Sequence, residues 1–158
     1  MSDAPTRRKP DLKKTLRLHA IWLRGGAGRV RADLSGADYD DQTLWPEFQI
    51  VPDSGPFWMW KKLQGGIIAH VEVSAEAARV SSTGRKCRAE YVTVLALYGP
   101  DATALGADAV GLSQHDGKTE YRVGAIVRPD TWDPDFRVEY SHGIHGFLRR
   151  KEAEQNAY

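Results

Sequence analysis

Cysteine is almost missing from this chain, since Cys87 is the only one in 158 residues. A single cysteine excludes an intramolecular disulfide framework. Long apolar runs are missing too. No stretch approaches the roughly 18 consecutive apolar residues that a membrane-spanning helix requires, and the N-terminus lacks the apolar segment of a signal peptide. From these absences we expect a soluble cytoplasmic protein that has no membrane partner.

Net charge is also low, but its distribution along the chain is uneven. The formal net charge is +1 at pH 7. Residues 1–31 nevertheless carry nine Lys or Arg against two acids, and residues 32–56 carry six acids and no Lys or Arg. Two interpretations stay open. Residues 7–31 either bind nucleic-acid phosphates in a salt-dependent way or form a solvated segment beside their acidic neighbour.

The composition is that of a folded domain, with 41 % hydrophobic and 27 % charged residues. Strands are predicted where β-branched and aromatic residues cluster between glycine and proline, at residues 56–62, 66–73, 90–99 and 119–129. Gln64-Gly65-Gly66 predicts a hairpin turn between the first two strands. The predicted fold class is α+β: a β-rich single domain with mainly antiparallel strands and a short C-terminal helix.

The remaining segments are expected to be short helices or loops. Residues 12–24 fit a short helix or strand, residues 74–80 a short helix or helical turn, residues 101–118 a loop, and residues 149–158 a helix. The chain therefore divides into a flexible basic leader at 1–11, an N-terminal segment at 12–48 and a β-rich domain at 49–158.

The N-terminal segment contains one short motif twice in tandem. The two copies are Ala32-Asp33-Leu34-Ser35-Gly36 and Ala37-Asp38-Tyr39-Asp40-Asp41. They resemble the pentapeptide repeat, whose small residue and central Leu or aromatic point into a right-handed β-helix. Two units make only half a coil, and a repeat stack needs several coils to bury a core. We therefore expect a vestige of the repeat or a docking edge.

The last two thirds of the chain resemble a domain of unknown function found in bacteriophage and bacterial proteins, often directly after pentapeptide repeats. The matching pieces occur in order: Ile50-Val51-Pro52, Trp60-Lys61-Lys62-Leu63, Thr83-Gly84-Arg85-Lys86-Cys87-Arg88-Ala89, Tyr121-Arg122-Val123-Gly124, Gly143-Ile144-His145, Lys151-Glu152-Ala153-Glu154 and Tyr158. Relatives commonly carry a cysteine where Ser141 stands, an aromatic where Gly146 stands and a helix-capping Thr where Arg149 stands. The resemblance implies a phage or prophage accessory protein and implies no reaction.

The densest polar cluster surrounds Cys87. Its neighbours Arg85, Lys86 and Arg88 predict a stabilised thiolate, and His142 or His145 within hydrogen-bond reach would complete a Cys–His nucleophile. Alternatively, Cys87 is a small buried hydrophobic residue. The three cations also fit a phosphate or carboxylate site, because arginines present bidentate donors, or else they form a solvated strand edge.

Two tryptophans give a second candidate binding group. Trp58 and Trp60 share one face of the predicted strand at 56–62, and Lys61 and Lys62 lie beside them. Such a group can stack a base or anchor a partner, while packing in the core is the alternative use.

The histidines His142 and His145 are spaced so that they could share a metal with His115, Asp116, Asp133 or Asp135. The glycines beside them favour a tight turn or bulge instead, so we assign neither a metal nor another cofactor. Gly143-Ile144-His145-Gly146-Phe147 also looks like the glycine–aromatic strand of ADP-ribosyltransferase-type folds, but no catalytic glutamate can be matched to that pattern.

These patterns favour a non-enzymatic, phage-type accessory protein that binds a host protein, a virion component or a phosphorylated small ligand. It would act in the host cytoplasm or in the virion. One alternative is a nucleotide-processing or ADP-ribosyl-related enzyme that uses Cys87, His145 and nearby arginines. A second alternative is nucleic-acid association through the basic N-terminus.

Overall fold

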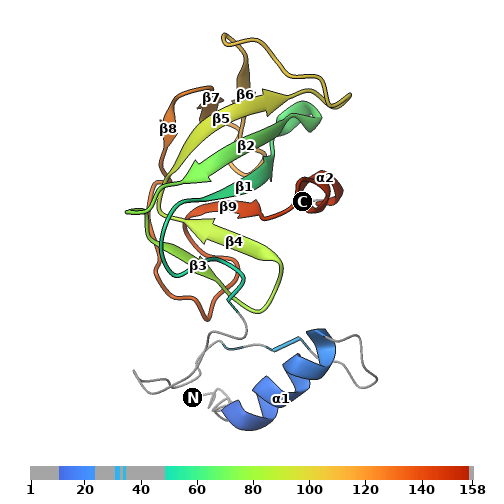
Figure 1. Cartoon of the computed structure of the whole chain (residues 1–158), viewed down its shortest axis with the longest axis vertical. Helices are drawn as coiled ribbons and strands as arrows, with labels where there is room; N and C mark the ends of the chain where they lie inside the picture. Colours follow the sequence, from blue (N-terminus) through green and yellow to red (C-terminus); the bar gives the residue numbers. More distant parts are fainter. Residues whose placement is uncertain (1–10, 24–30, 33, 35–48, 157–158) are drawn as a thin grey trace, which may run out of the picture.

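The structure is a computed structural model that describes residues 11–23, 31–32, 34 and 49–156. Its main feature is an antiparallel sheet of seven strands in the order β3-β4-β9-β1-β2-β5-β8 (Figure 1). The bounds of these strands are β1 Phe57–Lys62, β2 Ile68–Val73, β3 Arg79–Ser81, β4 Lys86–Ala89, β5 Val92–Tyr98, β8 Ile126–Val127 and β9 Ile144–Phe147. The last strand in sequence, β9, lies between β4 and β1 and pairs with both, so β3 and β4 join the rest of the sheet only through β9.

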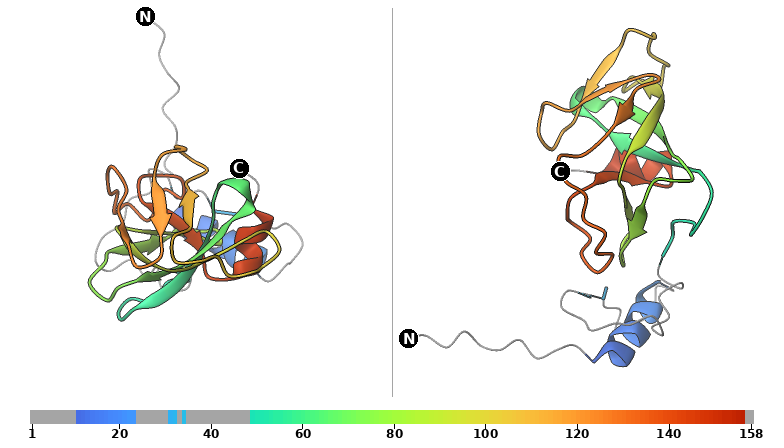
Figure 2. Two further views of the ribbon diagram at one scale, coloured as in Figure 1. Left: turned by 90° about the horizontal axis from the view of Figure 1, so that it is seen from above. Right: turned by 90° about the vertical axis from the view of Figure 1, so that its left-hand side faces the viewer.

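Smaller elements surround this sheet. They are the helix α1 (Leu12–Leu23), the 3-10 turn Gln64–Gly66, the second sheet of β6 (Val110–Leu112) and β7 (Glu120–Arg122), and the helix α2 (Arg150–Gln155). Helix α1 and the two-stranded sheet lie at opposite ends of the molecule (Figures 1 and 2). Helix α2 packs beside β1 and β9, and its Ala153 is fully buried.

Alternation along β1 and β2 sets the two faces of the sheet. Met59 pairs with Val71 on the core face, whereas Trp60 pairs with His70 on the other face. The core face buries Met59, Val71 and Val73 completely. Since successive residues of a strand point to opposite faces, Lys61 shares the core side with Met59.

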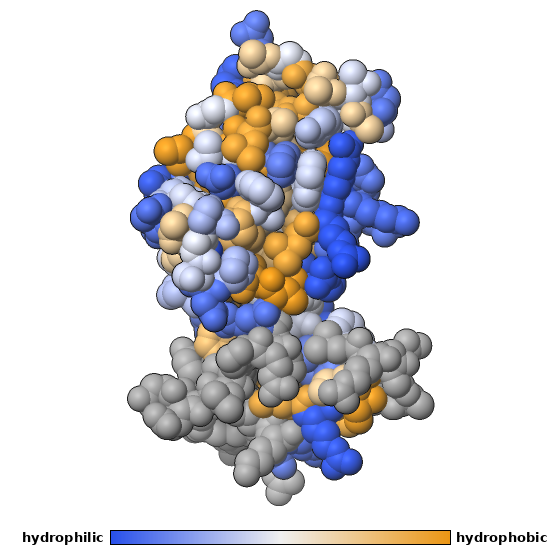
Figure 3. Space-filling view, viewed as in Figure 1, coloured by the Kyte–Doolittle hydropathy of each residue, from blue (hydrophilic) through white to orange (hydrophobic). Residues whose placement is uncertain are grey.

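The face shown in Figure 3 has an apolar area at one end of the sheet, besides others. Hydrophobic side chains gather over the end of the sheet that holds β5 and β8, while the side of α2 is hydrophilic (Figure 3). Leu95 and Ile126, which are 38 % and 60 % exposed, belong to these two strands.

The α+β prediction is confirmed, and its departures lie in short elements. The strands expected at 56–62, 66–73 and 90–99 and the turn at 64–66 are present. Residues 119–129 form two separate strands, and the predicted loop at 101–118 contains β6. Residues 74–80 form a turn that leads into β3, with the amide of Ala77 donating to the Ser74 carbonyl at 3.2 Å.

The described part of the N-terminal segment packs on the β-rich domain. Residues 12–23 form helix α1. Ala32 and Leu34 are buried against Leu16 and Phe136, and the Thr83 hydroxyl donates to the Ala32 carbonyl at 2.8 Å. The rest of both pentapeptide-like units and the leader at 1–10 lie outside the described residues. The pentapeptide interpretation and the domain boundaries therefore stay predictions.

We predict that Gly146→Ala destabilises the fold. A Cβ at this position would lie 3.1 Å from the Met59 Cβ and 3.2 Å from the Trp60 carbonyl oxygen. Overpacking of this kind costs about 1–3 kcal/mol, and urea unfolding would measure it. Gly106→Ala is the matched control, because nothing lies within 4 Å of its added Cβ. Equal midpoints for the two variants would contradict the prediction.

Candidate functional site

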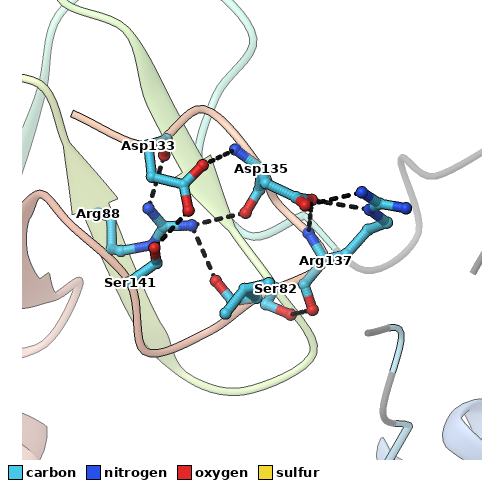
Figure 4. Close-up of polar contacts among 7 residues, drawn as sticks. Ser82, Arg88, Asp133, Asp135, Arg137 and Ser141 are labelled. Carbon is cyan, nitrogen blue, oxygen red and sulfur yellow. Dashed lines mark hydrogen bonds and ion pairs between the residues drawn. The ribbon is translucent and has the colours of Figure 1, made fainter. Parts of the chain in front are cut away.

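The site is built on a loop that one buried arginine holds in place. Arg88 is 2 % exposed and lies in β4. Its Nη1 donates to the carbonyls of Asp133 at 2.6 Å and His142 at 2.9 Å. Its Nη2 donates to those of Asp135 at 2.6 Å and Val138 at 2.8 Å. Figure 4 shows the bonds to Asp133 and Asp135. A guanidinium offers its donors in a fixed planar fork, so these bonds fix both ends and the middle of the loop at 133–142.

The loop also bonds to itself. The Asp135 carboxylate accepts from the amide of Arg137 at 3.0 Å and from its Nη2 at 2.8 Å, and the Asp133 carboxylate accepts from the Ser141 hydroxyl (Figure 4). These hydrogen bonds hold the pKa of both aspartates below the usual range. Arg88, Asp133 and Asp135 are thus used to fold the loop.

Gly143, the residue after the loop, allows a close approach. Its φ is +151°, and a Cβ there would lie 3.0 Å from the Trp132 ring and 3.3 Å from the Arg88 Cβ. The Trp132 ring lies over the guanidinium of Arg88, with 5.7 Å between the ring centroid and Cζ. The tight turn predicted from the glycines is therefore a site of close packing.

A cavity of about 430 Å³ opens between this loop and the sheet. Its walls come from β1, β4, β9, the β6–β7 hairpin and the segment before the loop. Its charged and titratable lining residues are Lys61, Lys86, His115, Asp116, Tyr121, Asp130, Tyr140, His142 and His145.

Lys61 is a buried cation in this cavity. It is 7 % exposed, its Nζ donates to the His145 carbonyl at 3.2 Å, and the Tyr121 ring centroid lies 6.0 Å away. No carboxylate of the described residues forms an ion pair with it. Burial, and secondly repulsion by Lys86, lower the pKa of Lys61 to about 8, although Asp116 acts in the opposite direction.

Lys86 is the second buried cation. It is also 7 % exposed, and its Nζ lies 4.6 Å from the centroid of the Tyr140 ring and 5.7 Å from that of Phe147. Burial lowers the pKa of Lys86, and Glu139 partly opposes this effect. Tyr140 is 68 % exposed, so an aromatic ring at the surface covers the Lys86 ammonium.

His145 is neutral at the wall of the cavity. Its Nε2–H donates to the Ser141 carbonyl at 2.6 Å, which leaves Nδ1 without the proton. Burial lowers the pKa of His145 to about 4, with smaller contributions from Lys61, Lys86 and Arg88.

A turn in the β6–β7 hairpin contains Asp116, the acidic group that raises the pKa of Lys61. The Asp116 carboxylate accepts from the amides of Lys118 at 2.9 Å and Thr119 at 3.0 Å, and from the Thr119 hydroxyl at 2.5 Å. These bonds hold the pKa of Asp116 well below its usual range. The donors of the turn therefore already stabilise the charge of the Asp116 carboxylate.

Six of the candidate residues from the sequence line the cavity: Lys61, Lys86, His115, Asp116, His142 and His145. The other candidates do not line it. The predicted lowering of the Cys87 pKa is wrong, because Cys87 is fully buried among Met59, Ala89 and Ile144. Desolvation raises the pKa of Cys87 to about 12, and Arg85 opposes it only in part. The interpretation as a small buried hydrophobic residue fits this environment.

Arg85 and Arg88 have partners inside the protein. The Nε of Arg85 pairs with Glu152 of α2 at 2.8 Å, and Arg88 holds the loop. Neither residue lines the cavity.

Trp58, Trp60 and Lys62 lie on the opposite face of β1 from Lys61. Trp60 stacks on His70 with 4.1 Å between ring centroids, Arg150 lies 5.6 Å from the Trp60 ring, and Trp58 is 60 % exposed. The prediction that the two tryptophans share a face is confirmed, because both contact His70. The Nζ of Lys62 donates to the Glu154 carbonyl at 3.1 Å.

Several lining residues were missed from the sequence, including Ser113, Thr119, Tyr121 and Tyr140. The Asp116-Gly117 pair was a usable signal, because Asp-Gly commonly marks a hairpin turn. No group of three or more metal-ligating side chains occurs among the residues with described positions. Within the same residues, no helix is long and apolar enough to cross a membrane.

Comparison with known proteins gives a family and no activity. A family model described as a family of unknown function (DUF5758) matches residues 47–153. The chain belongs to this family. No curated protein and no solved structure matches it. Every lining residue of the cavity lies within the DUF5758 domain, so the cavity belongs to the part of the chain that defines the family.

We predict that Arg88→Lys strongly destabilises the DUF5758 domain. A lysine cannot replace four donors in a planar fork, so loop carbonyls lose their partners. Breaking such a buried charged network costs about 3–5 kcal/mol. Urea unfolding measures the loss, and amide hydrogen exchange should show weaker protection in residues 133–142.

Arg85→Lys is the matched control, in the same segment of the DUF5758 domain. Its side chain is 44 % exposed, and an exposed ion pair contributes about 0–1 kcal/mol. If both variants lose the same stability, the hydrogen bonds of Arg88 do not hold the loop at 133–142 in place.

We also predict that the DUF5758 domain loses stability as pH falls from about 6.5 to about 4. In that range an unfolded histidine binds a proton, whereas folded His145 does not, so acidification favours unfolding. A shift of this size corresponds to at most roughly 3 kcal/mol. His19 and His70, whose pKa burial also lowers, act in the same direction.

Urea midpoints between pH 7 and pH 4 test this in the wild type and in His145→Gln. Glutamine keeps an N–H donor for the Ser141 carbonyl but does not titrate. The variant should therefore show a shallower fall. Identical slopes would exclude His145 as a main source.

Proposed function

We propose that the DUF5758 domain of this chain binds a small anionic ligand, one that carries a phosphate or a carboxylate, in the cavity beside Lys61 and Lys86. The observation that carries the proposal is that one cavity is lined by two buried lysines, each 7 % exposed. Burying two like charges side by side is costly, and an anion between them removes much of that cost. Lys61 has no carboxylate partner among the described residues that could do the same.

The rest of the cavity supports a small ligand. Its volume, about 430 Å³, falls within the range of small-molecule sites. Aromatic rings and imidazoles lie beside the lysines, and Asp116 is occupied by its own turn. The positive charge of the cavity thus comes from Lys61 and Lys86.

The phosphorylated small ligand was one of three partners expected from the sequence, and it is the one that the cavity favours. A phage-type accessory role is the biological setting that we propose for it, on the strength of the sequence resemblance.

Contact with a host or virion protein would use the exposed Trp58 beside Trp60. Nucleic-acid association through residues 7–31 stays a prediction, since residues 7–10 and 24–30 lie outside the described part.

Titration with inorganic phosphate and with succinate, followed by amide NMR, tests the proposal. We expect shifts at residues that line the cavity, and weaker binding as pH rises through about 8, where Lys61 loses its charge. Lys86→Met should weaken binding by roughly tenfold or more, because a charge-assisted hydrogen bond contributes about 1.5–3 kcal/mol.

Lys62→Met is the control for Lys86→Met, because Lys62 is also a lysine but follows Lys61 in β1, so that it faces the other side of the sheet and does not line the cavity. Its binding should equal that of the wild type. Absence of shifts at millimolar phosphate and succinate, or equal losses in both variants, would overturn the proposal.

A further inference from the structure

The two lysines of the cavity are not equivalent. Lys86 lies under the exposed Tyr140 ring and near Glu139, which favours its charged form. The Nζ of Lys61 donates to the His145 carbonyl and lies 6.0 Å from the ring centroid of Tyr121, which is 1 % exposed. The Lys61 amine is therefore next to a buried ring, whereas the Lys86 amine lies under a ring at the surface.

We propose that Lys61 is a nucleophile that forms an imine with a carbonyl group of the ligand, while Lys86 holds the anionic group of the same ligand. This inference rests on the proposed function and narrows the ligand class to small anionic aldehydes and ketones, such as oxo acids. A lysine next to another cation in a desolvated pocket is the arrangement that activates amines for this chemistry.

The chemical step needs only the amine and the carbonyl compound. The lone pair of Nζ attacks the carbonyl carbon, and the carbonyl π electrons move to oxygen, which takes up a proton. Nitrogen gives up a proton, which yields the carbinolamine. The hydroxyl group then takes up a proton and leaves as water while the nitrogen lone pair forms the C=N bond, and nitrogen releases its second proton to give the neutral imine. One amine and one carbonyl thus give one imine and one water, with no oxidant or reductant.

The protonation state of Lys61 supports this chemistry. With a pKa of about 8, roughly a tenth of the Lys61 amines are neutral at pH 7, a few hundredfold more than for a lysine in water. The hydrogen bond to the His145 carbonyl uses one N–H and leaves the nitrogen lone pair available. The groups that face this amine are Lys86, His145, Tyr121 and Asp116.

Reductive trapping of the full chain tests the inference. The protein is incubated at pH 7.5 with pyruvate, 2-oxoglutarate or dihydroxyacetone phosphate together with sodium cyanoborohydride, and intact mass and peptide mapping locate the adducts. We expect at least one probe to give a single adduct per chain at Lys61, at a rate at least tenfold above that at any other lysine. Inorganic phosphate should slow this adduct by competing for Lys86.

Variants separate the role of Lys61 from general lysine reactivity. Lys61→Arg should abolish the adduct, and Lys62→Met should leave it unchanged. The wild-type peptide map gives the answer even where a variant fails to fold. Adducts spread evenly over the lysines, or no adduct with any of the three probes, would overturn the inference.

The phosphate and succinate titration keeps the two proposals apart. Anion binding without an adduct at Lys61 leaves the proposed function in place and removes the imine. Failure of both experiments removes both.

Discussion

The four hydrogen bonds of Arg88 are the interaction on which the rest of the structure depends. Residues 133–142 form neither helix nor strand in the structure, so their carbonyls need partners from elsewhere. A buried guanidinium normally carries a large desolvation cost, and the four carbonyls offset it. The loop and the arginine therefore stabilise each other, and neither arrangement would persist without the other.

This loop has two sides with different tasks. Ser141 and His142 face the cavity, and the carbonyl of Ser141 sets the tautomer of His145. On the other side, Phe136 packs with residues of the N-terminal segment, and Glu139 pairs with Arg31 at 2.7 Å. A single anchored loop thus connects the cavity with the described part of the N-terminal segment.

The parts of the fold that were predictable from the sequence are those with strong local patterns. Alternation and flanking glycines revealed β1, β2 and β5, and helical propensity revealed α2. A strand of three residues such as β6 is too short for such a pattern, and the break between β7 and β8 inside residues 119–129 was not visible because the two strands pair with different partners. The cavity was not predictable as a whole, because Lys61, Lys86 and Tyr121 come from three separate segments.

The cluster at 85–88 shows that several cations close together in a sequence do not have to form one binding site. All of its cations were candidates for one ligand, yet Arg85, Lys86, Cys87 and Arg88 each have different neighbours. Backbone carbonyls occupy Arg88, a carboxylate occupies Arg85, and burial reverses the expected effect on Cys87. Lys86 differs because the nearby Lys61 brings a second positive charge into the cavity. The positive charge that these two lysines bring to the cavity thus depends on their positions in the fold and not on the number of cations in the sequence.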